Sequence, residues 1–218
     1  MSTVTFHLPI WFDLGATFLF ALTGAIAATK RGYDIVGVFF LALATGLGGA
    51  LIRDSVFLRS AAPTPLLTDA RYIELVLAGT VLGATFGRSI RWFHRVIAVI
   101  DAIGLGAYAV FGVQKSLTAG LAVPAALLVG VINAAGGGLV RDILTGEEPL
   151  VFKPGQFYVL TALAGAVTFV FLTAQLALPP TRAALIAIVL TFVFRTLSIV
   201  FNWRTAPFSE PPRPAAQP

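Results

Sequence analysis

The sequence predicts an all-α polytopic membrane protein with seven transmembrane helices, arranged as two inverted three-helix repeats followed by a seventh helix. Three observations lead to this fold class: an apolar composition, seven long apolar segments, and a duplication of the first half of the chain in the second. Of the 218 residues, 57% are hydrophobic and only 11% are charged, about half the usual share of charge. So few charged side chains would cover a soluble surface poorly. The composition therefore argues against a soluble enzyme, a nucleic-acid-binding protein and a disordered protein.

The net charge of +5 does not require nucleic acid as a partner, because basic residues in cytoplasmic loops give the same sum. The absence of cysteine excludes disulfides, thiolate metal sites and cysteine nucleophiles. The first ten residues contain no Lys or Arg, so the basic region of a cleavable signal peptide is missing. We therefore expect the first apolar run to remain as a membrane helix.

The apolar segments are long enough to cross a lipid bilayer, which takes about 20 residues of helix. The predicted spans are 10–29, 34–58, 72–90, 97–114, 119–144, 156–177 and 182–201. Lys30-Arg31-Gly32 closes the first span, and Pro63-Thr64-Pro65 follows the second. The third span has the charged residues Glu74 and Arg88 near its ends.

The later spans are bounded in the same way by polar or proline-containing sequence. Gly146-Glu147-Glu148-Pro149 closes the fifth span, and Pro179-Pro180 separates the sixth from the seventh. The tail 204–218 is polar and rich in proline, so it cannot build a core and is expected to be disordered.

The distribution of basic residues predicts the orientation, because cytoplasmic loops carry an excess of Lys and Arg. With the N-terminus outside, nine basic residues lie on or near the inner side and five on or near the outer side. The inner set is Lys30, Arg31, Arg88, Arg91, Arg95, Arg141, Lys153, Arg204 and Arg213, and the outer set is Arg53, Arg59, Arg71, Lys115 and Arg182. We expect the inner membrane of a prokaryote, with the N-terminus outside and the C-terminus in the cytoplasm.

An internal duplication relates the two halves of the chain at an offset of 88 residues. Asp13 then matches Asp101, and the string Gly48-Gly49 with the Arg53-Asp54 that follows matches Gly136-Gly137 and Arg141-Asp142. After a shift of two residues, Pro63 matches Pro149 and Tyr72 matches Tyr158.

Each repeat holds three spans, and three is odd, so the second copy must enter the membrane inverted relative to the first. Inverted repeats occur in transporters, whose sites lie at the repeat interface near the middle of the membrane. The predicted division is a first repeat at 10–93, a second repeat at 97–179, a seventh helix at 182–203 and the tail at 204–218.

Glycine clusters lie in the second span and in its counterpart, the fifth. They are Gly46, Gly48 and Gly49 in the one, and Gly136, Gly137 and Gly138 in the other. Glycines allow a helix to kink and to present carbonyl groups to a cavity. Alternatively, small residues only let helices pack closely. Because the clusters are duplicated, each next to an Arg-Asp pair, we favour kinked helices that line a cavity.

Charged residues inside the spans need partners, because charge is costly in a membrane. Arg53 and Asp54 are sequence neighbours whose side chains leave the helix about 100° apart, so we expect them not to neutralise each other. The offset then suggests two pairs, Asp13–Arg53 and Asp101–Arg141. Such pairs either hold the bundle together or also bound a pore.

Two further cations lie within or at the end of a span. Arg195, in the seventh span, has Asp142 or Asp101 as a plausible partner, or else extends toward the inner interface. Lys115 ends the fourth span and either anchors it or reaches a cavity mouth. The chain contains no nucleophile elbow, phosphate-binding loop or His-Glu-x-x-His pair. We therefore expect neither an enzyme nor a bound cofactor or metal.

The duplicated motif, Gly48-Gly49 with Arg53-Asp54 and Gly136-Gly137-Gly138 with Arg141-Asp142, resembles that of the prokaryotic trimeric intracellular cation (TRIC) channels. This resemblance covers about residues 10–203. It implies a homotrimer in a lipid bilayer, in which every protomer has its own hourglass-shaped, potassium-permeable pore, with K⁺ or Na⁺ as the expected permeant ion. It also implies that the second and fifth helices line the pore and bend at these glycines. The four motif charges would then lie beside the constriction.

The resemblance has limits. Animal members carry a Lys-Glu-Val motif where this chain has Lys30-Arg31-Gly32, so calcium or phosphoinositide regulation is not carried over. Similar bacterial proteins have been labelled glycine transporters. The sequence thus predicts a passive monovalent-cation channel gated at the glycines, with carbonyl groups there attracting the ion. The alternative is an alternating-access carrier of a small amino acid such as glycine. The duplicated charges disfavour a purely structural scaffold.

Overall fold

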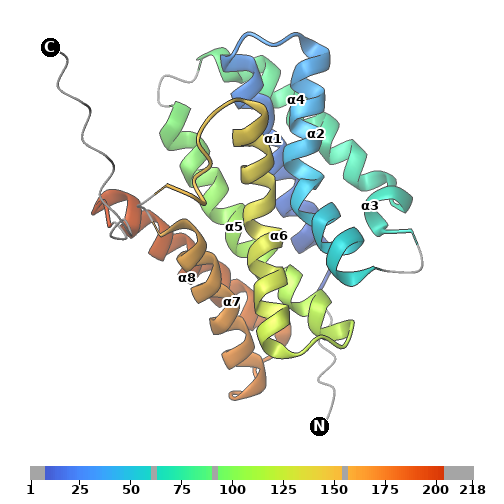
Figure 1. Cartoon of the computed structure of the whole chain (residues 1–218), viewed down its shortest axis with the longest axis vertical. Coiled ribbons are helices and arrows are strands. Elements are labelled where there is room, and N and C mark those ends of the chain that lie inside the picture. The colour runs from blue at the N-terminus through green and yellow to red at the C-terminus, as the bar shows by residue number, and fades with distance from the viewer. Residues whose placement is uncertain (1–7, 60–62, 90–92, 154–156, 204–218) are drawn as a thin grey trace, which may run out of the picture.

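The computed structural model describes residues 8–59, 63–89, 93–153 and 157–203, and the regular elements in these ranges are all helices (Figure 1). The predicted all-α class is therefore confirmed. The predicted disorder of the tail 204–218 lies outside the described residues. The helices are α1 (Trp11–Lys30), α2 (Ile35–Leu51) with a π-helix (Ile52–Leu58), α3 (Pro65–Thr68), α4 (Ala70–Phe86) with a 3₁₀ turn (Gly87–Ser89), α5 (Phe93–Thr118), α6 (Val123–Leu144), α7 (Tyr158–Ala174) and α8 (Pro180–Val200).

Each predicted span coincides with a helix, and the ends agree to within four residues. Five stretches are long and apolar enough to cross a membrane: α1, α2 with its π-helix, residues 95–118 of α5, α6 and α8. Two predicted spans are shorter helices, because α4 and α7 have 17 residues each. The structure thus gives several membrane-length helices within the described ranges.

Helix α1 is central to the bundle and packs against α2, α4 and α5. Helix α5 continues the packing to α6 and α8, and α7 contacts α5, α6 and α8. In Figure 1, α7 and α8 lie together on one side and α4 lies on the other. The buried core has two parts, one built mainly from α1, α2 and α4 and the other mainly from α5 to α8. These parts correspond approximately to the two halves of the sequence.

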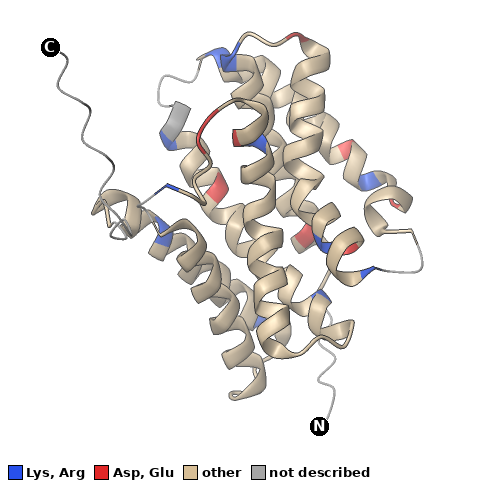
Figure 2. Cartoon of the chain, in the orientation of Figure 1, with Lys and Arg blue, Asp and Glu red and all other residues tan. Residues whose placement is uncertain are grey.

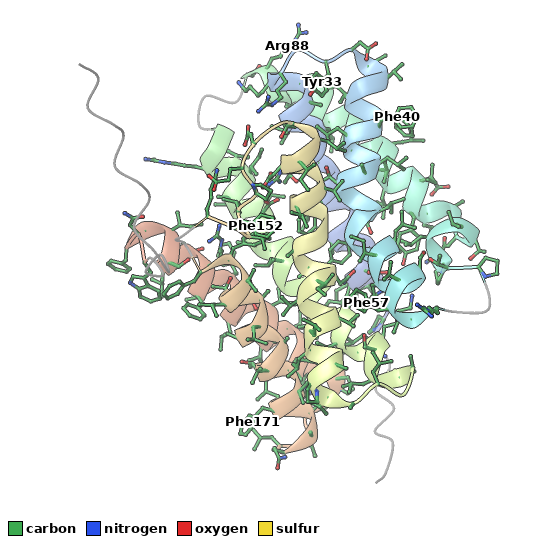
Figure 3. All side chains as sticks on the ribbon, viewed as in Figure 1. Tyr33, Phe40, Phe57, Arg88, Phe152 and Phe171 are labelled. Atoms are coloured by element: carbon green, nitrogen blue, oxygen red, sulfur yellow. The ribbon has the colours of Figure 1, made fainter. Side chains whose placement is uncertain are left out.

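The outer faces of the bundle carry large apolar side chains. Phe40 of α2 and Phe171 of α7 are more than half exposed and point outward (Figure 3). Long stretches of ribbon carry no charge, and many of the charged positions lie toward the helix ends (Figure 2). An apolar belt of this kind suits contact with lipid.

Polar caps fix the start of two helices in the first half. The carboxylate of Asp34 accepts a 2.8 Å hydrogen bond from the amide of Gly37 at the start of α2. Asp69 precedes α4 and accepts hydrogen bonds from the side chain of Arg71, at 2.6 Å, and from its amide, at 3.0 Å. These bonds hold the pKa of Asp69 below its usual range. Both helices therefore begin where an acidic cap satisfies the first amides.

Candidate functional site

Helices α2 and α6 touch at their glycines. A Cβ atom on Gly49 would overlap the carbonyl oxygen of Asn133, and one on Gly137 would overlap the carbonyl oxygen of Thr45. Thr45 and Asn133 are themselves 88 residues apart, as are the two glycines. The contact is therefore reciprocal, as in a surface that pairs with its own copy about a two-fold axis.

The two helices run in opposite directions through this contact. A Cβ atom on Gly48 would meet the side chain of Val140 at 3.3 Å, and one on Gly136 would meet the side chain of Ile52 at 3.6 Å, so the order along one helix is reversed on the other. The aromatic rings of Phe20 and Tyr108, also 88 residues apart, stack on each other with centroids 5.3 Å apart. Offset-related residues thus meet one another at the centre of the molecule.

The glycines permit close packing, which is one of the two roles that the sequence left open. Helix α6 is α-helical from Val123 to Leu144, through its three glycines, and α2 remains α-helical to Leu51. The expected change in helix geometry begins later in the second span, where a seven-residue π-helix starts at Ile52. Short π-helical turns inside helices are frequently found at functional sites. This one carries the Arg53-Asp54 pair.

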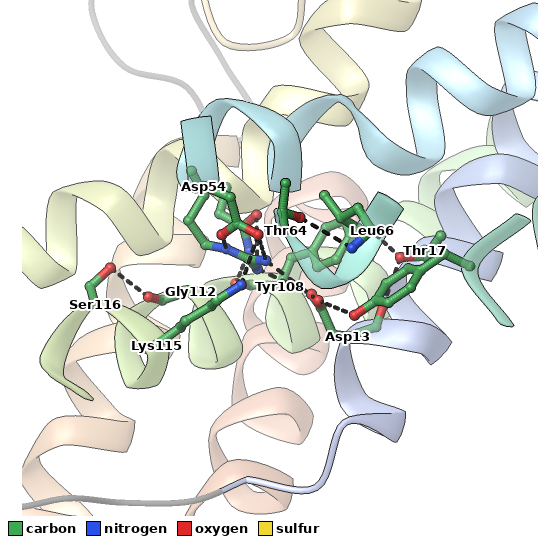
Figure 4. Close-up of polar contacts among 12 residues, drawn as sticks. Asp13, Thr17, Asp54, Thr64, Leu66, Tyr108, Gly112, Lys115 and Ser116 are labelled. Atoms are coloured by element: carbon green, nitrogen blue, oxygen red, sulfur yellow. Dashed lines mark hydrogen bonds and ion pairs between the residues drawn. The ribbon is translucent and has the colours of Figure 1, made fainter. Parts of the chain in front are cut away.

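A first charge cluster lies beside the π-helix (Figure 4). The buried guanidinium of Arg53 donates to Asp13 at 3.1 Å and to Asp54 at 2.6 Å. Tyr72 donates its hydroxyl to Asp13 at 2.7 Å, and the ammonium of Lys115 lies 2.7 Å from Asp54. The predicted Asp13–Arg53 pair is thus present. Two cations face two carboxylates, so the formal charges of the cluster cancel.

A second charge cluster repeats this pattern at the offset positions. Arg141 lies 2.9 Å from Asp101 and 3.0 Å from Asp142, so the second predicted pair is also present. Arg141 also donates to the hydroxyl of Thr23 at 3.1 Å. The guanidinium of Arg195 lies 5.0 Å from the ring centroid of Tyr158.

A cavity of about 320 Å³ adjoins the second cluster. Its lining includes both carboxylates of the cluster together with the guanidinium groups of Arg141 and Arg195. Loop residues Glu147, Glu148 and Lys153 also line it. Lys115 of the first cluster is partly exposed. The second cluster therefore adjoins a cavity, and the first cluster has one partly exposed side chain.

One expectation about the charges is wrong. Arg53 and Asp54 were expected not to neutralise each other, but they form an ion pair, and so do Arg141 and Asp142. The Cβ directions of neighbours diverge, but the long arginine side chain folds back, and its planar guanidinium reaches the next carboxylate. Each arginine therefore has its offset partner and its sequence neighbour at the same time.

The two remaining cations both lie beside a charge cluster. Lys115 reaches the first cluster and does not simply anchor α5. Arg195 is buried and lines the same cavity as Asp101 and Asp142, so its side chain does not extend to an interface.

Several polar groups in the site were not identified from the sequence. The hydroxyl of Tyr108 donates to the carbonyl of Gly46 and contacts the hydroxyl of Thr17. The amide of Asn133 donates to the carbonyl of Tyr108 at 2.7 Å. The duplication could have identified Tyr72 as a site residue, because a tyrosine recurs at the matching place in the second repeat. No comparable signal marked Tyr108, whose counterpart is the apolar Phe20.

The family described as "Glycine transporter" matches the chain over residues 10–88 and 98–174, which fall inside the two predicted repeats. The UPF0126 membrane protein of Deinococcus radiodurans is 32% identical over 157 residues, covering 72% of each chain. The UPF0126 inner membrane protein YadS of Escherichia coli K12 is 27% identical over 203 residues, covering 93% of this chain and 97% of YadS.

Two solved structures superpose closely on this fold. The TRIC trimeric intracellular cation channel orthologue from Rhodobacter sphaeroides superposes with a TM-score of 0.82 at 32% identity. The match covers 88% of this chain and 97% of that one. A second structure, described as "Structural basis for conductance through TRIC cation channels", superposes with a TM-score of 0.74 at 30% identity. The match covers 93% of this chain and 98% of that one.

Proposed function

This chain belongs to the family described as "Glycine transporter" and has the fold of the prokaryotic TRIC channels, and from this premise we propose that it is a passive channel for monovalent cations. The observation that carries the proposal is the shared fold with structures described as TRIC cation channels. This likeness favours the channel over the glycine carrier that the sequence left as the alternative.

The proposed architecture has seven spans in two inverted repeats, with α4 and α7 as the two shorter crossings. The reciprocal contact between α2 and α6 supports it, because these equivalent helices run in opposite directions. The N-terminus lies outside and the C-terminus in the cytoplasm, as the basic residues suggest. Three protomers assemble, as in the relatives described as trimeric.

The proposed pathway passes the crossing of α2 and α6. From one end, a cation enters the cavity beside Asp101 and Asp142. From the other end, it approaches the first cluster beside Lys115. Between them, Gly49 and Gly137 hold the two backbones in contact, so the pathway is closed in this conformation. Opening requires the helices to separate at Gly46, Gly48 and Gly49 and at the three glycines of α6, which exposes carbonyl groups to the ion.

Recording from planar bilayers tests this proposal. Purified protein is expected to give unitary currents in symmetrical KCl, and its reversal potential in a KCl gradient is expected to lie near the potassium equilibrium potential. Uptake of radiolabelled glycine into proteoliposomes supplies the contrasting measurement. Saturable glycine uptake without unitary currents would replace the channel with the carrier.

A further inference from the structure

A chain of two hydroxyl groups connects α1, α5 and α2 at the centre of the molecule. The Thr17 hydroxyl lies 2.9 Å from the carbonyl oxygen of Asp13 and 2.7 Å from the Tyr108 hydroxyl. The Tyr108 hydroxyl in turn reaches the carbonyl oxygen of Gly46. Thr17 and Tyr108 are completely buried, and Figure 4 shows them beside Asp13. We call the two side chains, with the carbonyls of Asp13 and Gly46, the hydroxyl relay.

The hydroxyl relay has three contacts but only two protons, because each hydroxyl carries one hydrogen. Two oxygens 2.7 Å apart attract each other only with a proton between them. If Thr17 supplies that proton, Tyr108 donates to Gly46 and the carbonyl of Asp13 lacks this donor. If Tyr108 supplies it, Thr17 donates to Asp13 and the carbonyl of Gly46 lacks its donor. The bond to Gly46 is thus present in one of two arrangements.

The hydroxyl relay exists in one half of the molecule only. At the offset of 88 residues, Phe20 occupies the place of Tyr108, Leu105 that of Thr17, and Ala134 that of Gly46. Neither Phe20 nor Leu105 has a hydroxyl, so the equivalent carbonyl of α6 receives no such donor. The α2 glycines are tied to α5 through the Tyr108 hydroxyl. Helix α6 is tied to α5 by a different bond, in which the amide of Asn133 donates to the backbone carbonyl of Tyr108, so this bond does not depend on the hydroxyl.

We propose that Tyr108 and Thr17 are positioning residues that control the bend of α2 at Gly46, so that α2 and α6 move unequally when the pathway opens. This proposal rests on the proposed channel function for its conduction readout. With Tyr108 bonded to Gly46, α2 is held against α5 in the closed crossing. With Tyr108 bonded to Thr17, the hold on α2 is released.

Two variants of the hydroxyl relay have opposite expected effects. Tyr108→Phe keeps the ring stacked on Phe20 but removes the bond to Gly46, and we expect it to raise the ratio of open to closed time about five-fold. Thr17→Val removes the competing acceptor, so Tyr108 donates to Gly46 alone and the ratio is expected to fall by a similar factor. Thr173→Val is the matched control, since that buried hydroxyl donates to carbonyls of its own helix.

A distance measurement tests the same idea without conduction. The chain has no cysteine, so nitroxide labels attach only where they are introduced. Val36→Cys with Val56→Cys brackets the glycines of α2, and Leu128→Cys with Leu144→Cys brackets those of α6; all four positions are exposed. Pulsed electron resonance on the full chain in bilayers, diluted with unlabelled protein to suppress distances between subunits, gives each distance distribution.

We expect Tyr108→Phe to shift or broaden the α2 distribution, Thr17→Val to narrow it, and neither variant to change the α6 distribution. The proposal is overturned if Tyr108→Phe leaves the α2 distribution unchanged. It is equally overturned if both variants shift that distribution in the same direction, or if α6 changes as much as α2. A wild-type protein that carries no current would refute the channel function alone, because the distances still decide the role of the hydroxyl relay.

Discussion

Tyr72 of α4 donates a 2.7 Å hydrogen bond to the carboxylate of Asp13 in α1. Its counterpart in the second repeat, Tyr158, is equally buried, but within the described part of the chain its hydroxyl has no hydrogen-bond partner. The ring of Tyr158 instead lies against the guanidinium of Arg195. The duplicated tyrosines therefore differ in function: one acts through its hydroxyl and the other through its ring.

This difference predicts unequal effects of removing the two hydroxyls. Tyr72→Phe should lower the free energy of unfolding by about 1–2 kcal/mol, because Asp13 loses a hydrogen bond to its charged carboxylate. Tyr158→Phe keeps the ring against Arg195 and should leave stability unchanged or slightly higher. Thermal unfolding of both variants in the same detergent measures the difference. Equal losses in the two variants would contradict the assignment.

The crossing of α2 and α6 predicts strong intolerance of a methyl group at Gly49. In Gly49→Ala the new Cβ would overlap the backbone of Asn133, which cannot move as a side chain can. We expect a loss of about 1–3 kcal/mol or more, seen as a low yield of folded oligomer in size-exclusion chromatography. The control is Gly15→Ala in α1, where a Cβ meets nothing within 4 Å. Alanine favours helix there, so stability should rise or stay constant.

The duplication made part of the site predictable. Once Asp13 and Asp101 fall at one offset with Arg53 and Arg141, a contact in one copy implies the same contact in the other. Both pairs are present. The helix positions were predictable for a similar reason, because a run of about 20 apolar residues has few alternatives to a membrane helix.

Features that break the symmetry were harder to predict. Lys115 completes the first cluster, but it belongs to the second repeat and its counterpart 88 residues earlier is Ala27, so the duplication gives no signal for this lysine. Tyr108 donates its hydrogen bond to the backbone carbonyl of Gly46. Every residue has such a carbonyl, so the residue type at position 46 does not indicate the bond. The pairing of Arg53 with Asp54 depends on how a long side chain folds back, and Cβ directions alone do not show this.

The balance of the first cluster predicts a selectivity change in Lys115→Met. Arg53 and Lys115 face Asp13 and Asp54, so removing the lysine leaves one uncompensated negative charge at this end of the pathway. We expect the permeability of K⁺ relative to Cl⁻ to rise, measured as the reversal potential in a KCl gradient. Lys115→Arg keeps the charge and serves as the control. An unchanged reversal potential in Lys115→Met would place the first cluster outside the conducting pathway, and a fall in the K⁺ preference would contradict the predicted sign.

Burial predicts very different energies for the ion pairs Asp101–Arg141 and Arg31–Glu147, which both contribute to the lining of the cavity, the second through Glu147 alone. Asp101 and Arg141 are almost completely buried, so Asp101→Asn leaves a guanidinium short of one charge in a low-dielectric region and should cost about 3 kcal/mol. Glu147 and Arg31 are 43% and 38% exposed, so Glu147→Gln should cost at most about 1 kcal/mol. Salt screens exposed charges more than buried ones. When the free energy of unfolding is measured in low and in high KCl, the loss caused by Glu147→Gln should therefore be smaller in high KCl. The loss caused by Asp101→Asn should be nearly the same in both. If both effects shrank alike, water would have to reach Asp101 freely through the cavity, and the second cluster would be solvated in the closed state.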